Sequence, residues 1–87
     1  MSDELIQRVR SVIATAQRLP LEKVTIESTF EELGIDSMDG MTILFAVESE
    51  FDISVSDEDA KSIHTVRQMA EGVEKLLAAK SSGSATA

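Results

Sequence analysis

Apolar residues recur at a spacing of three and four in four separate stretches of this chain, as they do along one face of a helix. These stretches predict helices over residues 3–17, 37–51, 57–63 and 66–79. The first is expected to stop at Leu19-Pro20, because the residue before a proline disfavours helical geometry. Residues 19–36 then form a long connection, with a short turn near residues 20–23. We predict an all-α fold: a four-helix bundle of three longer helices and one short helix, with a long first connection.

The chain has 87 residues, which suits one small domain, and we assign residues 1–80 to it. Residues 81–87, SSGSATA, are small and polar and are predicted to form a disordered tail. No run approaches the ~20 apolar residues needed to span a membrane. The first residues, MSDELIQRV, lack a charged-then-apolar export pattern, so we expect a cytosolic protein.

The charge of the chain is strongly acidic and unevenly distributed. The net charge is −8, and residues 24–60 contain eleven Asp and Glu but no Lys or Arg. Direct binding to nucleic acid is excluded, because neutralising phosphates needs a basic surface. The acidity favours protein partners with basic docking patches, which long-range attraction steers to it. We expect the chain itself to be a monomer.

The helix predicted over residues 37–51 carries two apolar faces. One is an ordinary core stripe, formed by Gly40, Ile43, Leu44, Val47 and Phe51. The other is formed by Met38, Met41 and Phe45, with Glu48 continuing it. A helix in so small a protein can hardly bury both faces, so the second is expected to be an exposed docking surface. The alternative is that both belong to one wide core face.

Ser37 stands at the entrance of this helix, where several backbone N–H groups lack intrahelical partners. The helix dipole there favours an anion attached at the serine. By itself the residue also has an ordinary interpretation, as a cap whose hydroxyl serves those amides.

The segment Leu33-Gly34-Ile35-Asp36-Ser37-Met38-Asp39 resembles the attachment motif of acyl carrier proteins, in which Asp-Ser-Leu/Met opens the second helix. The similarity covers about residues 3–79, so the domain assigned above to residues 1–80 is expected to be an acyl carrier domain. It implies that Ser37 holds 4′-phosphopantetheine through a phosphodiester, delivered from coenzyme A by a phosphopantetheinyl transferase. It further implies that acyl groups are carried as thioesters on the terminal thiol. The chain has no cysteine, so this sulfur has to come from the added group.

The resemblance also implies roles for residues around the serine. Partner enzymes that load, transfer or synthesise acyl groups would dock on Asp36, Met38, Asp39, Met41, Phe45 and Glu48. The acyl chain would retreat into the bundle core between visits. By position, the candidates that line this pocket are Val47, Val55, Ala60, Ile63 and Met69.

Some positions depart from the general fatty-acid carriers. Those carriers have acids where this chain has Thr42 and Ser49. Phe30 also stands one residue closer to Gly34, a spacing more like carrier domains of polyketide synthases. We therefore favour a specialised carrier of fatty-acid, lipid or polyketide-type biosynthesis over the housekeeping one.

Three other functions stay open from the sequence: a peptidyl or aminoacyl carrier that uses the same serine, an unmodified acidic interaction module and, weakest, a hydrolase. His64 is the only histidine and has no identifiable nucleophile or metal companion, so no catalytic residues are expected. The acids at 57–59 do not fit a calcium loop, so no metal site is expected either.

Overall fold

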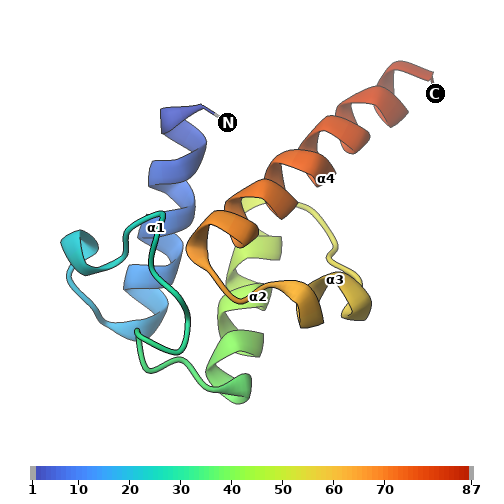
Figure 1. Cartoon of the computed structure of the whole chain (residues 1–87). Helices are drawn as coiled ribbons and strands as arrows, with labels where there is room; N and C mark the ends of the chain where they lie inside the picture. The colour runs from blue at the N-terminus through green and yellow to red at the C-terminus, as the bar shows by residue number, and fades with distance from the viewer. Residues whose placement is uncertain (1, 87) are drawn as a thin grey trace.

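The computed structural model describes residues 2–86, with side chains up to Lys80, and its regular elements are helices joined by loops (Figure 1). Helix α1 spans Asp3–Gln17, α2 Ser37–Phe51, α3 Asp57–Ser62 and α4 Val66–Thr86, and a single 3₁₀ turn, η1, spans Leu21–Lys23. The predicted all-α bundle of three longer helices and one short helix is confirmed. The 3₁₀ turn lies where a short turn was predicted.

Each helix begins at a residue whose side chain suits a helix start. The Ser2 hydroxyl accepts a hydrogen bond from the Leu5 N–H, and Ser56 does the same for Asp59 at the start of α3. At α4, the Thr65 hydroxyl accepts from the Gln68 N–H at 3.0 Å. The Gln68 side chain accepts in return from the His64 N–H at 2.7 Å, one residue earlier than in the usual capping box.

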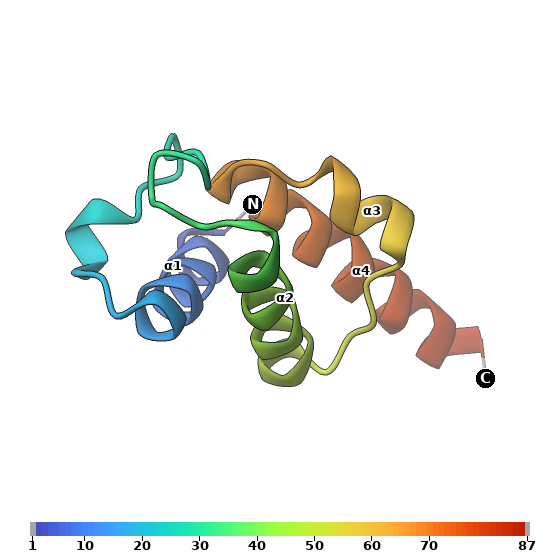
Figure 2. The same cartoon turned by 90° about the horizontal axis from the view of Figure 1, so that it is seen from below.

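The core lies where α1, α2 and α4 meet, and α1 packs against both other helices. The largest side chains that are almost wholly buried are those of Val9, Ile13, Val24, Ile43, Val47, Val66 and Val73. Short α3 lies on the side of α2 away from α1 (Figures 1 and 2). No side chain of α3 is fully buried, so this short helix lies at the edge of the main core.

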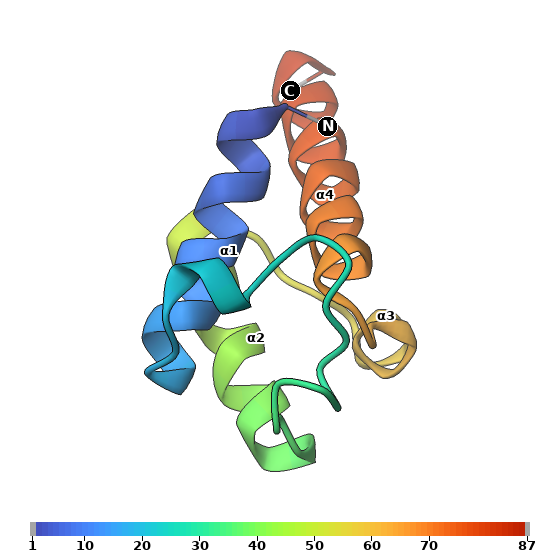
Figure 3. The same ribbon diagram turned by 60° about the vertical axis from the view of Figure 1, so that its left-hand side comes forward.

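The long connection between α1 and α2 is fixed by hydrogen bonds at both ends. Near its start, Arg10 donates from α1 to the carbonyl oxygens of Leu21 and Val24. Further on, the connection runs beside the beginning of α4 (Figure 3), where Thr29 and Thr65 form an isolated antiparallel bridge. The Phe30 N–H donates to the His64 carbonyl at 2.9 Å. These contacts fix the point from which α2 begins.

Helix α4 is longer than predicted, because it continues from residue 79 to Thr86. Residues 81–86 are therefore helical where the sequence led us to expect a disordered tail, and Ala87 lies outside the described residues. Lys80 ties α4 to the end of α2 by donating to the Asp52 carboxylate at 2.7 Å, which anchors the helix directly before this segment. The end of the domain at residue 80 stays a prediction. Within residues 2–86, no helix is both long enough and apolar enough to cross a membrane.

Candidate functional site

Ser37 is the first residue of α2, and its side chain is exposed. The residue that caps the helix is Asp36, whose carboxylate accepts a hydrogen bond from the Asp39 N–H at 2.8 Å. The alternative that Ser37 is an ordinary cap is therefore wrong: Asp36 already fills that role. The Ser37 hydroxyl makes no hydrogen bond to any described residue. It is available for chemistry.

The backbone around the serine is positioned by the segment before it. Gly34 has a φ of 73°, a left-handed conformation that glycine adopts without strain. The Ile35 N–H donates to the Phe30 carbonyl at 2.9 Å, and the Ile35 side chain is buried. A buried side chain two residues before Ser37 anchors the helix entrance while leaving the hydroxyl in solvent.

A cavity of about 880 Å³ opens beside the serine. Its walls come from the end of the long connection, the first half of α2, α3 and the beginning of α4. Its apolar lining consists of Phe30, Ile35, Gly40, Met41, Leu44, Ala60, Ile63 and Met69. Ser37 and Asp36 lie in the lining as well, so an exposed hydroxyl and an apolar hollow share one site.

Three of the five predicted pocket residues, Ala60, Ile63 and Met69, line this cavity. The structure does not bring Val47 and Val55 to it. Val47 is wholly buried in the core, and Val55 lines a separate cavity of about 310 Å³. Ile63 and Met69 line both cavities and so lie between them. The site residues that sequence reasoning missed include Leu44, which had been placed on the core stripe, and Lys61 on α3.

The second apolar face of α2 is exposed, as predicted. Met38, Met41 and Phe45 are 80%, 54% and 59% exposed, which is unusual for such large apolar side chains. We call these three residues the α2 stripe. It begins directly after Ser37, and Met41 also reaches the cavity lining. The alternative of one wide core face is excluded by these exposures.

Glu48 differs from the α2 stripe in its surroundings. Its side chain is half-buried, and its carboxylate accepts a hydrogen bond from the Val55 N–H at 2.8 Å. It therefore holds the segment between α2 and α3 against α2, a structural contact that sequence spacing did not reveal. A docking role for Glu48 stays a prediction.

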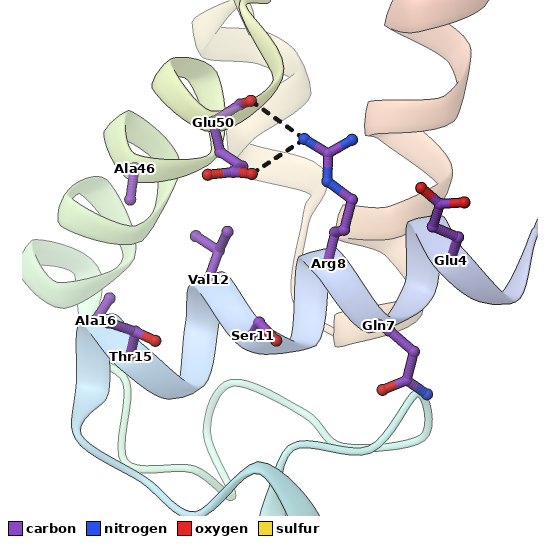
Figure 4. Close-up of a pocket in the computed structure, with 9 residues that line it drawn as sticks. All are labelled: Glu4, Gln7, Arg8, Ser11, Val12, Thr15, Ala16, Ala46 and Glu50. Carbon is purple, nitrogen blue, oxygen red and sulfur yellow. Dashed lines mark hydrogen bonds and ion pairs between the residues drawn. The ribbon is translucent and has the colours of Figure 1, made fainter.

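A further hollow of about 680 Å³ lies between α1 and α2, and Figure 4 shows its lining. Arg8 reaches from α1 to Glu50 on α2, with an ion pair of 3.0 Å, and its guanidinium lies 4.5 Å from the centre of the Phe51 ring. Ser37 is not part of this lining. These contacts hold α1 against α2.

No group of three or more metal-ligating side chains gathers anywhere in the described residues. Asp36 and Asp39 place negative charge near Ser37. Asp36 and Ser37 are exposed and Asp39 is half-buried, so the charge lies at the surface that a partner would approach.

The sequence and the fold were compared with known proteins. The family described as the phosphopantetheine attachment site matches residues 7–73. An acyl carrier protein of Trieres chinensis is 37% identical over 75 residues, which cover 85% of this chain and 94% of that protein. A chloroplastic acyl carrier protein of Casuarina glauca is 40% identical over 79 residues, covering 90% of this chain but 58% of that protein.

The fold has a solved relative too. The crystal structure of an acyl carrier protein from Thermotoga maritima superposes with a TM-score of 0.74 at 32% identity, covering 85% of this chain and 87% of that one. Family match, relatives and fold agree with the exposed serine at the start of α2 and the cavity beside it. The chain belongs to the acyl carrier protein family, whose members are carriers rather than enzymes and bear covalent 4′-phosphopantetheine.

Proposed function

We propose that Ser37 is the attachment residue and that this chain carries acyl groups on the arm bound there. One observation carries the proposal: an exposed hydroxyl with no hydrogen-bond partner among the described residues stands at the start of α2, on the rim of an apolar cavity. Ser37 also lies within the matched family region, residues 7–73. When attached, the group supplies the terminal thiol that the chain lacks, and an acyl cargo is held on it as a thioester.

The residues around Ser37 fit the group chemically. The backbone N–H groups at the start of α2 favour the negative phosphodiester, since a helix N-terminus carries partial positive charge. Asp36 fixes the first turn through its bond to the Asp39 N–H, so Ser37 Oγ has a defined position. During attachment Ser37 Oγ gives up its proton to a base on the transferase and bonds to the phosphorus next to the pantetheine of coenzyme A, while the pyrophosphate bond breaks and adenosine 3′,5′-bisphosphate leaves.

The cavity beside Ser37 supports an acyl cargo over an aminoacyl one. Its lining is mainly apolar, with Leu44, Ile63 and Met69 among the residues that contribute to it. Burying an apolar chain against such a lining yields about 0.8 kcal/mol per CH₂, whereas a charged ammonium gains nothing from apolar surface. Val47 and Val55 enter this proposal only if the cavity enlarges, because neither lines it.

The α2 stripe supports docking of partner enzymes beside the serine. Exposed methionine and phenylalanine give an adaptable apolar surface, and Asp36 and Asp39 add negative charge at its edge. The family works with transferases and synthases, and basic patches on such enzymes complement this charge. The same surface would serve the phosphopantetheinyl transferase.

The pathway and compartment belong to the proposal as well. Thr42 and Ser49 leave α2 with fewer acids than general fatty-acid carriers have, which supports a specialised carrier with few partners. We retain the expectation of a cytosolic monomer. The relatives from Casuarina glauca and Brassica napus are named chloroplastic, and these names describe those proteins.

The test is modification by a promiscuous phosphopantetheinyl transferase with coenzyme A, followed by intact-mass measurement. The expected result is a gain equal to one 4′-phosphopantetheine group, lost in Ser37→Ala. The matched control is Ser49→Ala, which removes another exposed serine of α2 and should keep the gain. No gain in the wild type would leave the interaction-module alternative, and a gain in Ser37→Ala would place the arm elsewhere.

A further inference from the structure

The charges around the cavity beside Ser37 are of mixed sign. Three carboxylates contribute to its lining, from Glu31, Asp36 and Asp57. Lys61, near the end of α3, is the one Lys or Arg among the lining residues. A phosphodiester attached to Ser37 would therefore meet repulsion from most of its charged neighbours and attraction from one side chain.

Lys61 is free to respond to such an anion. Three other cations are paired with carboxylates: Arg8 with Glu50, Arg67 with Glu27 and Lys80 with Asp52. The Lys61 side chain is exposed, and its ammonium makes no hydrogen bond or ion pair with any described residue. Its flexible four-carbon stem allows the ammonium to move toward a new negative charge.

Lys61 and Ser37 line the same cavity from different helices. Helix α3 begins at the Ser56 cap, and the residue before Lys61, Ala60, contributes to the apolar lining. An arm attached to Ser37 on α2 and drawn toward Lys61 on α3 would therefore lie along this cavity.

We propose that Lys61 is a positioning residue that attracts the phosphodiester of the arm and so directs the arm over the cavity. The inference rests on the proposed attachment at Ser37 and concerns a residue outside the attachment motif. It gives the arm a preferred direction when no partner is docked. The preference is modest, because exposed ion pairs stabilise weakly and are screened by salt.

The absence of cysteine gives a direct test, because the arm then supplies the only thiol in the protein. Holo wild type, Lys61→Gln and Lys75→Gln are compared by their rates of reaction with a maleimide at low salt. Lys75 is the matched control, an exposed lysine on α4 that does not line this cavity. We expect Lys61→Gln to react about 1.5- to 5-fold faster than wild type, which is the range that an exposed ion pair supports. Lys75→Gln should react as wild type does, and Lys61→Arg should restore the slow rate.

A second readout follows the phosphorus itself. The ³¹P chemical shift of the holo protein should differ between wild type and Lys61→Gln at low salt and converge at about 1 M salt, where screening reaches ~3 Å. Intact mass first confirms that each variant is loaded. A loaded Lys61→Gln that matches Lys75→Gln in thiol rate and ³¹P shift would overturn the role of Lys61 alone. A wild type that cannot be loaded would instead overturn the attachment at Ser37.

Discussion

Asp36 has two expected roles that substitutions can separate. In the structure its carboxylate caps α2 by accepting from the Asp39 N–H at 2.8 Å. By resemblance it also presents negative charge to the phosphopantetheinyl transferase. Asp36→Ala removes both the hydrogen bond and the charge, whereas Asp36→Asn keeps a capping oxygen and removes only the charge.

The magnitudes follow from capping energetics. Replacing an aspartate cap by alanine costs about 1 kcal/mol, and asparagine caps nearly as well as aspartate. For a domain of this size about 1 kcal/mol lowers Tm by about 4–8 °C. We therefore expect Asp36→Ala to lose about 1 kcal/mol of unfolding free energy and Asp36→Asn to lose less than about 0.5 kcal/mol.

Two assays are needed, urea unfolding for stability and the initial rate of modification by the transferase at a temperature where every variant is folded. Asp36→Asn should be nearly as stable as wild type yet be modified several-fold more slowly. If Asp36→Asn is as unstable as Asp36→Ala, the hydrogen bond is not what stabilises the start of α2. If Asp36→Asn is modified at the wild-type rate, the transferase does not recognise the negative charge of Asp36.

Other predictions concern the α2 stripe, the loop before α3 and acid stability. Phe45→Ser should change the free energy of unfolding by less than about 0.5 kcal/mol but slow the transferase reaction about fivefold. Its control is Leu21→Ser, at an exposed apolar residue outside the α2 stripe, which should leave the rate of modification unchanged. Glu48→Ala should lower the free energy of unfolding, measured by urea unfolding, by about 1 kcal/mol, because it removes the acceptor of the half-buried Val55 backbone N–H. The hydrogen bond and charge of Lys80 lower the pKa of Asp52 below its ordinary 3.8, so this contact stabilises the fold above that pH and is lost as pH falls through the folded pKa. An NMR titration should show the Asp52 pKa returning to its ordinary value in Lys80→Gln, and no change would contradict the pairing.

The sequence predicted the helices well because each begins at a residue that caps it and carries apolar residues at helical spacing. The exposure of the α2 stripe was also predictable, because 87 residues cannot bury two faces of one helix. The end of α4 was not predictable, because the small polar composition of residues 81–86 is also typical of a disordered tail. Small polar residues are compatible with both states, and composition alone does not separate them.

The cavity was only partly predictable, because it depends on how α3 sits against α2. The resemblance, taken by position, named Ala60, Ile63 and Met69 as candidates, and these three residues line the cavity beside Ser37. It could not show that Val47 turns fully into the core or that Val55 lines a different cavity. Nor could it show that Asp36 is the cap and leaves Ser37 free, since both types cap helices equally well.

The most direct test of the account is the state of Ser37 in protein isolated from the cell that makes it. Residues 24–61 contain a single Lys or Arg, Lys61 at the end, so trypsin releases Ser37 within one peptide. Fragmentation of this peptide should place one 4′-phosphopantetheine group on Ser37, with or without an acyl cargo. A peptide that is entirely unmodified, or that bears the group on another residue, would contradict the central claim.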